Sequence, residues 1–377
     1  MSRNEFVVSP YIYYTREKSN EIMLNNILVG EKSVINNKIE KLIIECKTKK
    51  KYQWLIEKFG EQLVDEAIDN KIILEEDKKW NSTRYRYIEI EINTDCNYRC
   101  EYCPVRNEPK ERKVMSIEAF KEVINKVKKY ENIEKVSFSF YNEPTLDPYF
   151  LQRIDILKEN NLKLILHTNG SMLSKTYIDY LCDSNVVDII YFNFPNYDKK
   201  LFTDITRNPL YDKVVENIDY AVSRGLNIDF SIQKTDANYR ENIDKMNEIY
   251  GYKINKKIVA WDTVDRAGLL KNKYNQNVNL NGKLFGCKKV LEWLFVDVNG
   301  NCFICFNDFY VKNVFGNILE NEIQDIIDGE KYTIIMKKLF GDVEASEDFL
   351  CRSCYEMKLM AIYSKLSDNL EKVMEND

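Results

Sequence analysis

Three cysteines stand close together in one short segment of the chain, Cys96-Asn97-Tyr98-Arg99-Cys100-Glu101-Tyr102-Cys103. Three thiolates at this spacing suit an iron-sulfur cluster in which one iron has no protein ligand, and chemistry can take place at that open iron. A structural zinc site is the alternative, but it needs four ligands, and neither a histidine nor a further cysteine lies nearby in the sequence. The spacing therefore favours a cluster over zinc.

A second set of cysteines lies in the last quarter of the chain and comprises Cys287, Cys302, Cys305, Cys351 and Cys354. Two pairs in this set, 302/305 and 351/354, have the C-x2-C spacing of a zinc ribbon, so a four-cysteine zinc site competes with an iron-sulfur site here. The two cysteines outside both sets, Cys46 and Cys182, fall in apolar helical patterns and are expected to be small buried residues.

Composition limits the class of protein. The chain has 377 residues, 44% of them apolar, which is enough for one large domain and one or two small ones. Its 55 basic and 60 acidic residues give a net charge of -5, which argues against a nucleic-acid partner. Because we find neither a signal sequence nor an apolar stretch that could span a bilayer, we expect a cytoplasmic protein with no membrane partner. Clustered cysteines in a reducing compartment are typical of metal ligation rather than disulfides.

From residue 85 onward, short apolar runs alternate with amphipathic stretches, which predicts parallel strands joined by helices. The predicted strands cover residues 87–92, 135–140, 162–167, 187–194, 227–232 and 257–261, and the predicted helices cover residues 117–130, 148–160, 175–182, 212–224 and 239–250. The first cysteine segment follows the first strand. It should therefore lie at the carboxyl end of the sheet, where parallel barrels place their chemistry.

The pattern C-x3-C-x2-C, with the aromatic Tyr102 before the last cysteine, resembles the signature of the radical S-adenosylmethionine (SAM) superfamily. The resemblance implies an α/β fold with a partial (β/α)6 TIM-like barrel over residues 85–265. It also implies that Cys96, Cys100 and Cys103 hold a 4Fe-4S cluster whose open iron binds SAM. In that family the reduced cluster cleaves SAM to a 5'-deoxyadenosyl radical, so the cofactors carry the difficult step. An external electron donor such as flavodoxin or ferredoxin is expected.

Further positions at strand ends match the SAM-binding elements of this family. Tyr141-Asn142-Glu143-Pro144 stands where the family has Gly-Gly-Glu-Pro, whose carboxylate holds the SAM ammonium group. Since both glycines are replaced, we expect a different local backbone path. The resemblance assigns cofactor binding to Tyr102, Tyr141, Asn142, Glu143, Asn169, Asn193, Arg207 and Ser231. The single histidine, His167, is expected to be a satisfied polar residue at a strand end, and a lone histidine argues against histidine-based acid-base catalysis.

The second cysteine set, with Asp265-Arg266-Ala267-Gly268, Val298-Asn299-Gly300-Asn301 and Phe315-Gly316-Asn317-Ile318, resembles the auxiliary-cluster domain called SPASM, and its shorter form Twitch fits better. Over residues 266–377 the resemblance implies one additional 4Fe-4S cluster held by Cys287, Cys305, Cys351 and Cys354. Cys302 would be the spare cysteine. A fully ligated cluster binds neither SAM nor substrate, so its expected role is to accept or relay an electron.

Residues 1–84 are predicted to form a separate small module, with strands at 11–15 and 21–24, helices at 34–46, 52–59 and 62–70, and a closing strand at 71–74. This order resembles the winged-helix, PqqD-like elements that bind leader peptides by adding them as a strand to a sheet edge. A purely structural cap is an alternative interpretation. A nucleic-acid-binding winged helix is a third, which the acidic balance disfavours.

Together these resemblances imply a radical SAM oxidoreductase, similar to the maturases of ribosomal peptides, that abstracts a hydrogen atom from a peptide and oxidises or cross-links it. Its leader-bearing peptide would bind to residues 1–84. Two other interpretations stay open. The same machinery could act as a dehydrogenase of a small molecule such as a sugar alcohol or an aminocyclitol, or both cysteine sets could be structural zinc sites in a non-catalytic binding protein.

Overall fold

The computed structural model describes residues 5–16, 21–234, 239–261, 266–270 and 280–361. The chain divides into two compact units. One unit comprises residues 1–84, 278–292 and 327–377, and the other comprises residues 85–277 and 293–326. Asp265, part of a sequence element singled out above, lies outside the described residues. None of the helices in the described ranges has both the length and the apolar character needed to cross a membrane.

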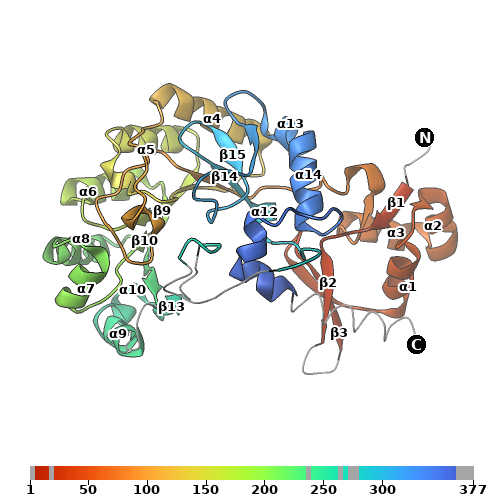
Figure 1. Cartoon of the computed structure of the whole chain (residues 1–377), viewed down its shortest axis with the longest axis horizontal. Helices are drawn as coiled ribbons and strands as arrows, with labels where there is room; N and C mark the ends of the chain where they lie inside the picture. The colour runs from red at the N-terminus through yellow and green to blue at the C-terminus, as the bar shows by residue number, and fades with distance from the viewer. Residues whose placement is uncertain (1–4, 17–20, 235–238, 262–265, 271–279, 362–377) are drawn as a thin grey trace. The chain divides into compact units, whose positions relative to one another are not determined.

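The second unit is built on a sheet in which five parallel strands are neighbours in chain order, β7 (Tyr87–Ile90), β8 (Lys135–Phe138), β9 (Lys163–Thr168), β10 (Val187–Phe192) and β11 (Ile228–Phe230). The helices that join them lie along the outer side of the sheet (Figure 1): α4 (Ile117–Tyr130), α5 (Phe150–Glu159), α6 (Lys175–Ser184), α7 (Lys199–Thr206) and α8 (Tyr211–Ser223). Alternation of strands and helices gives this layering because each helix covers the sheet with its apolar face. The predicted α/β class is confirmed.

The fifth strand differs from the prediction because it breaks at Ser231. β11 ends at Phe230, and the next two residues form β12 (Ile232–Gln233), which pairs in a separate two-stranded sheet with β13 (Ala260–Trp261). Between them, α9 (Tyr239–Met246) continues through a π-helical turn (Asn247–Gly251) into α10 (Tyr252–Ile254). The sixth predicted strand therefore exists but belongs to another sheet.

A hairpin from the later part of the chain extends the same sheet on the other side of β7. Strand β14 (Trp293–Val296) runs parallel to β7, with Leu294 opposite Ile88, and continues into the antiparallel strands β15 (Asn301–Phe303) and β16 (Val314–Asn317). The turn between β14 and β15 needs glycine at Gly300, because its φ is 83° and a Cβ there would lie 2.6 Å from the Leu319 side chain. Helix α13 (Ile323–Asp328) follows.

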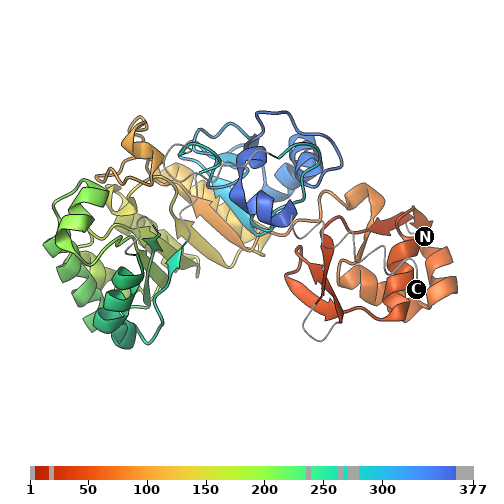
Figure 2. The same ribbon diagram turned by 60° about the horizontal axis from the view of Figure 1, so that its bottom comes forward.

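The first unit contains two small antiparallel sheets and a group of short helices. One sheet has the order β5 (Lys50–Lys51), β1 (Glu5–Val8), β6 (Ile73–Glu75), and the other has the order β2 (Ile12–Arg16), β3 (Ile22–Asn26), β4 (Glu31–Val34). The helices are α1 (Asn37–Glu45), α2 (Tyr52–Phe59), α3 (Glu61–Asp69), α12 (Lys289–Glu292) and α14 (Glu330–Leu339). In Figure 2 the red strands of the N-terminal segment lie to one side of its orange helices.

Local signals explain most of this segment. Asn36 caps α1 by accepting hydrogen bonds from the amides of Lys38 and Ile39, both at 3.0 Å. Leu42 of α1 and Leu55 of α2 are buried in a common core. Strands β1 and β4 were not predicted, and all four residues of β4 are exposed, so that strand has no hydrophobic alternation to detect.

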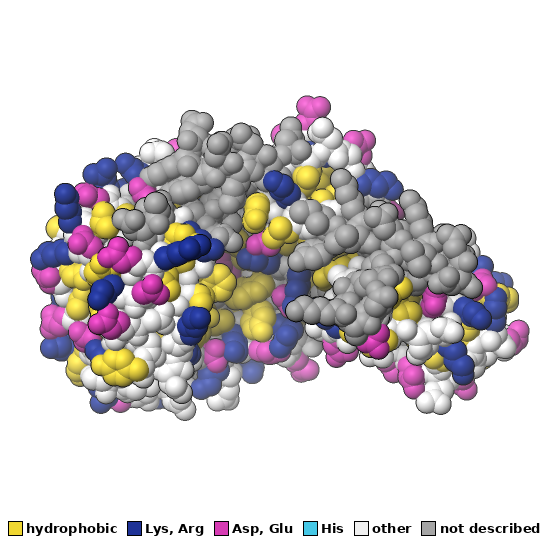
Figure 3. Space-filling view, turned by 90° about the horizontal axis from the view of Figure 1, so that it is seen from below, with side chains coloured by type: hydrophobic (Ala, Val, Ile, Leu, Met, Phe, Trp, Pro, Cys, Tyr) yellow, Lys and Arg dark blue, Asp and Glu magenta, His cyan; other side chains and the backbone are white. Residues whose placement is uncertain are grey.

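Charged side chains of both signs are interspersed on the face of the molecule seen in Figure 3. Over the described residues of that face, the surface charge is thus mixed rather than separated into regions of one sign.

A buried ion pair ties α5 to the loop that follows β8. Arg153 and Asp147 are both completely buried, and the Arg153 Nε lies 2.5 Å from the Asp147 Oδ2. The Arg153 guanidinium also donates to the carbonyl of Met115 and lies over the Phe120 ring, 4.9 Å from its centroid. Each of these two buried charges is stabilised by the other, because neither can be hydrated instead.

We therefore expect Arg153→Met to lower the free energy of unfolding by about 3–5 kcal/mol, since Asp147 would remain buried without its cation. Urea denaturation monitored by tryptophan fluorescence measures the change. Arg86→Met is the control, because Arg86 is half exposed in its pair with Glu134 and should contribute at most about 1 kcal/mol. Equal shifts for the two variants would contradict the prediction.

Candidate functional site

The loop that carries the first three cysteines leaves the carboxyl end of β7 and is fastened by the backbone of α7. The amides of Arg99 and Glu101 donate to the carbonyl oxygens of Thr206 and Ile205, at 2.9 and 3.0 Å. These carbonyls belong to the last turn of a helix, where carbonyl groups have no partners within the helix. A helix that the sequence patterns did not predict therefore fixes the path of the cysteine loop.

The three thiols of this loop lie close enough to affect one another's ionisation. Burial, followed by the nearby Cys103 and Cys96, raises the pKa of Cys100 well above its usual value. Burial also raises the pKa of Cys96 to about 12 and raises the pKa of Cys103. Buried thiols that oppose one another's charge are a donor set that iron ions would neutralise, so these residues fit an iron-sulfur cluster.

Within the described ranges, no three His, Cys, Asp or Glu side chains are arranged to hold one metal ion together. In a cluster each thiolate binds a separate iron, so the three cysteines would not need to share one ion.

Glu143 is buried beside this loop, and its carboxylate accepts four hydrogen bonds. Oε1 accepts from the Thr145 amide at 3.1 Å, the Thr145 hydroxyl at 2.6 Å and the Thr168 hydroxyl at 2.7 Å, and Oε2 accepts from the Asn169 amide at 2.6 Å. Burial raises the pKa of this carboxyl, and the hydrogen bonds oppose that rise. Because Oε2 has a single donor, it can accept another, such as an ammonium group.

The residue before the two that replace glycines, rather than either of those two, has the unusual backbone conformation. Tyr141 and Asn142 have no positive φ, whereas Phe140 has a φ of 143°, a conformation that is costly for a residue with a Cβ. The side chain of Asn142 donates to the Asn93 Oδ1 at 2.8 Å. Tyr141 packs instead against Phe140 and Phe309, with ring centroids 4.7 and 4.9 Å apart.

Asn169 takes part in a closed set of side-chain hydrogen bonds that holds the cysteine loop. Its Nδ2 donates to the Asn97 Oδ1 at 2.8 Å, the Asn97 Nδ2 donates to the Ser171 Oγ at 2.8 Å, and the Ser171 hydroxyl donates back to the Asn169 Oδ1 at 2.7 Å. Asn208 adds a bond from its side chain to the Asn97 carbonyl at 3.1 Å. The turn after β9 is therefore joined to the loop after β7.

The side chains of Tyr102 and Asn193 contact each other, whereas the side chain of Arg207 is exposed. The Tyr102 hydroxyl donates to the Asn193 Oδ1 at 2.9 Å, and the amide of Ser231 donates to the carbonyl of Phe192 at 2.8 Å where the fifth strand breaks. Arg207 is exposed at the end of α7 with a φ of 55°, and its side chain makes no hydrogen bond or ion pair within the described ranges. The structure thus brings Asn193 to the cysteine loop, whereas the side chain of Arg207 is exposed although its neighbours Thr206 and Asn208 bond to that loop.

Three of the later cysteines, Cys287, Cys351 and Cys354, belong to the first unit. Burial, and after it the neighbouring Cys354, raises the pKa of Cys287 to about 11. The thiol of Cys354 therefore lies within electrostatic range of Cys287.

The other two later cysteines belong to the second unit. Cys302 is fully buried in β15 opposite Val296, the position of an ordinary core residue. Cys305 lies in the loop after β15. Burial is the main cause that raises the pKa of Tyr141, and the thiols of Cys103 and Cys305 add to the rise, so Tyr141 lies near a cysteine of each set.

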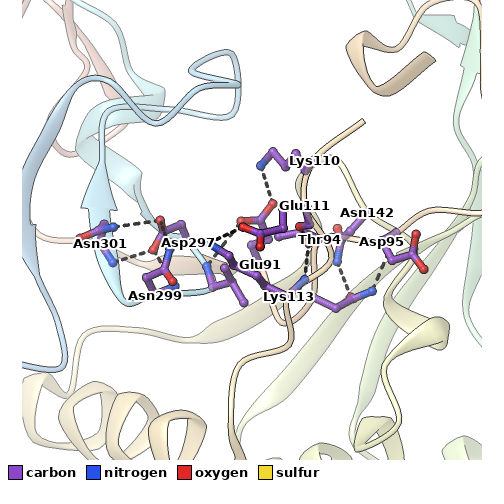
Figure 4. A network of polar contacts seen from close by, with 12 residues as sticks. Glu91, Thr94, Asp95, Lys110, Glu111, Lys113, Asn142, Asp297, Asn299 and Asn301 are labelled. Carbon is purple, nitrogen blue, oxygen red and sulfur yellow. Dashed lines mark hydrogen bonds and ion pairs between the residues drawn. The ribbon is translucent and has the colours of Figure 1, made fainter. Parts of the chain in front are cut away.

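A network of charged residues lies where β7 and β14 end side by side (Figure 4). The buried Glu91 accepts from the Lys110 Nζ at 2.6 Å, and its amide donates to the Val296 carbonyl at 2.9 Å. A cavity of about 330 Å³ opens beside this pair and is also lined by Lys113 and Asp297. None of these residues was singled out from the sequence.

Some of the residues that were not predicted from the sequence have a local sequence signal, and others have none. Asp198, whose side chain accepts from the Leu201 amide at 2.8 Å, is a typical N-cap and could have revealed α7. Thr168 stands directly before Asn169 in a turn that resembles a Thr-Asn-Gly element of the family, but the bond from its hydroxyl to Glu143 joins two strand ends and has no local signal. The Glu91–Lys110 pair joins residues on two segments of one loop, a pairing that no periodicity encodes.

Known protein families match the two parts of the chain that carry the cysteine sets. Residues 90–250 match the family described as the radical SAM superfamily, and residues 278–355 match the SPASM family, described as an iron-sulfur cluster-binding domain. The S-adenosyl-L-methionine-dependent 2-deoxy-scyllo-inosamine dehydrogenase of Niallia circulans is 24% identical over 273 residues, which cover 72% of this chain and 92% of the relative.

Two solved structures share the fold. SuiB of Streptococcus suis, bound to its precursor peptide SuiA, has a TM-score of 0.56 and 13% identity, and the match covers 94% of each chain. Native anSMEcpe with bound AdoMet and the Cp18Cys peptide has a TM-score of 0.52 and 16% identity, and the match covers 77% of this chain and 99% of the other.

The chain therefore carries a radical SAM core and a C-terminal SPASM domain, and it is an enzyme of the oxidoreductase kind. These domains imply a 4Fe-4S cluster, an auxiliary cluster and SAM as cofactors. The cofactors predicted from the two cysteine sets are therefore confirmed. The ligand assignments, the three domain boundaries and the PqqD-like character of residues 1–84 stay predictions.

The protonation of His167, in β9, tests whether this region of the sheet is shielded from water. Its ring stacks on Tyr191, with centroids 4.9 Å apart, and burial lowers its pKa to about 4. Since an unperturbed histidine has a pKa of about 6.5, the unfolded chain binds a proton in the pH window from about 6.5 down to 4 and the folded chain does not. His167 should therefore be neutral at pH 6, and stability should fall as the pH drops through this window.

Because His167 is the single histidine of the chain, its imidazole proton resonance gives the midpoint directly in an NMR titration. His167→Phe keeps an aromatic ring and should lose less stability than the native protein between pH 7 and pH 5. A midpoint at 6 or above would show that the ring is not desolvated.

Proposed function

We propose that this enzyme, which carries a radical SAM core and a SPASM domain, abstracts a hydrogen atom from a peptide and modifies that peptide oxidatively, for example by forming a cross-link. One observation carries the core of the proposal. The cysteine loop, with its Cys96 thiol within electrostatic range of Glu143, meets that buried carboxylate at the carboxyl ends of β7, β8 and β9, and the carboxylate has capacity for another donor.

In this proposal Cys96, Cys100 and Cys103 hold the first cluster, and Cys287, Cys305, Cys351 and Cys354 hold the auxiliary one. When bound, the clusters and SAM supply a 5'-deoxyadenosyl radical and an acceptor for an electron. Glu143 would accept a hydrogen bond from the ammonium group of SAM. Tyr102, Asn193 and Ser231 would face its nucleoside part. Tyr141 and Asn142 would border its methionine part. Arg207 would need to leave its exposed position to reach the carboxylate.

Burial of these groups supports their role. Glu143 is 1% exposed, and Asn169 is 5% exposed. Side chains that are already fixed by hydrogen bonds lose little freedom when a cofactor binds, so they can orient it without further rearrangement. Exclusion of water from the same place protects a reactive radical from side reactions.

The extent of the fold match supports a peptide as the substrate. SuiB is bound to a precursor peptide in its structure, and the match with it covers 94% of this chain, which has to include most of residues 1–84. An N-terminal module shared with a peptide-binding enzyme suits recognition of a leader peptide, which can pair with an exposed strand edge. An external reductant such as flavodoxin or ferredoxin would supply the electron.

Dehydrogenation of a small molecule is the second candidate. The relative that acts on 2-deoxy-scyllo-inosamine is 24% identical to this chain, a higher identity than that of the two solved structures. A Twitch-type arrangement of the later cysteines would serve either reaction.

Replacement of the first cysteines tests the radical chemistry. After anaerobic reconstitution with iron and sulfide, Cys96→Ala, Cys100→Ala and Cys103→Ala should each reduce dithionite-driven 5'-deoxyadenosine formation to background, because the SAM-binding iron would be lost. Chromatography of the nucleoside measures the effect. A variant that keeps more than a tenth of the native rate would remove that cysteine from the ligand set.

Replacement of the later cysteines tests the second ligand set. Cys287→Ala, Cys305→Ala, Cys351→Ala and Cys354→Ala should keep SAM cleavage but lose iron and stop modification of the substrate. Cys302→Ala is the matched control, because its thiol lies in the core of β15. If this variant loses as much iron as Cys305→Ala does, the assignment of Cys305 over Cys302 is wrong.

The substrate class can be decided with the complete enzyme. A peptide encoded next to this gene should bind in a calorimetric titration and should change in mass when it is incubated with SAM and reductant. Conversion of 2-deoxy-scyllo-inosamine under the same conditions, without any change in the peptide, would favour the small-molecule reaction.

A further inference from the structure

The ammonium group of Lys110 lies inside an aromatic cage. Its Nζ is 4.1 Å from the centroid of the Phe140 ring, 5.3 Å from that of Phe309 and 5.9 Å from that of Tyr141. The Lys110 side chain is 15% exposed, so much of its charge is withdrawn from water. Ring faces attract a cation most strongly when it is desolvated, and three of them hold this one.

Glu91 fixes the opposite side of the same ammonium group. The two atoms of the ion pair, Lys110 Nζ and Glu91 Oε1, are 2.6 Å apart, and the Glu91 side chain is 2% exposed. The other carboxylate oxygen lies 3.4 Å from the amide of Val298, in the turn after β14 (Figure 4). The pair is therefore oriented, with its negative end toward the hairpin and its positive end toward the aromatic rings.

Rings of the cage also belong to the cluster against which Cys103 packs. Val105, Tyr141 and Phe309 form a buried cluster, and Cys103 and Phe140 pack against it. Lys110 and Cys103 therefore both lie against the same aromatic cluster, and a charge in so apolar a setting acts across it.

One residue of the cage has an energetically unfavourable backbone conformation. Phe140, whose ring is nearest to the ammonium, is the residue with a φ of 143°. Strain of this kind persists where the surrounding contacts over-determine a conformation, and it is concentrated at functional sites. A buried ion pair adds a second cost, because well-packed apolar residues of similar size are often at least as stabilising. Stability alone therefore does not account for a charge in this place.

We propose that Lys110, oriented by Glu91 within the cage of Phe140, Tyr141 and Phe309, is a positioning residue that keeps a fixed positive charge behind Cys103 and raises the reduction potential of the cluster this cysteine holds. The inference rests on the proposed function in one respect, the role of Cys103 as a ligand. A nearby positive charge stabilises the reduced, more negative form of a cluster, and net charge around a cluster is one of the factors that set its potential.

The test is a redox titration of the reconstituted enzyme, followed by the EPR signal that changes when SAM is added, since that signal belongs to the cluster with the open iron. Lys110→Met keeps the length of the side chain and removes the charge, so the midpoint potential should fall. Glu91→Gln keeps the ammonium and removes the opposing carboxylate, so the midpoint should rise. Lys110→Arg should restore most of the native value.

Lys126→Met is the matched control, because it removes another largely buried ammonium, 7% exposed against 15% for Lys110, from α4. Its midpoint should equal that of the native enzyme. If Lys110→Met fails to take up a full cluster, the Glu91→Gln variant decides alone: an upward shift supports the inference and no shift overturns it.

Two further outcomes separate this inference from the function on which it rests. If the native enzyme gives no SAM-sensitive EPR signal, the proposed function fails together with the inference. If the signal is present and the midpoints of Lys110→Met and Glu91→Gln both equal the native one, the proposed function stands and Lys110 is a structural residue.

Discussion

A carboxylate buried at the ends of parallel strands has to be satisfied by hydrogen bonds, and the donors that satisfy Glu143 organise the whole site. Thr145 comes from the loop after β8, and Thr168 and Asn169 come from the end of β9. The Glu143 amide in turn donates to the Asp95 carbonyl in the loop after β7 at 2.8 Å. One residue therefore fixes three neighbouring strand ends relative to one another, and removing any of its donors would leave a buried charge short of partners.

The cysteine loop depends on that framework because it has little regular structure of its own. It is held by the last carbonyls of α7 and by the Asn97, Asn169 and Ser171 side chains. A cluster requires its ligands at set positions before it binds, and a loop tied from two sides supplies them with a small loss of entropy. Helix α7 is in this sense part of the site, although the sequence patterns did not predict the helix.

The sheet also joins the two kinds of domain that the comparisons identify. Strand β14, from the part of the chain that matches SPASM, pairs with β7, the first strand of the radical SAM core. This pairing brings the hairpin and its aromatic residues against the loop that follows β7, and it creates the place where the Glu91–Lys110 pair lies. Charges held in so apolar a setting act over longer distances than charges in water, which is why a single ammonium there can matter for redox chemistry.

The sequence by itself determined the class of cofactor chemistry and the order of the core strands, but not every helix between them, since α7 was missed. Thiol spacing is a local property, and the alternation of apolar and amphipathic stretches is read over windows of a few residues, so the cluster loop and the strands β7 to β11 were predictable. The break at Ser231, the pairing of Leu294 with Ile88 and the cage around Lys110 were decided by the tertiary structure alone. Each of these depends on which distant segments pack together, and packing between segments far apart in the chain leaves no periodic signal in either one.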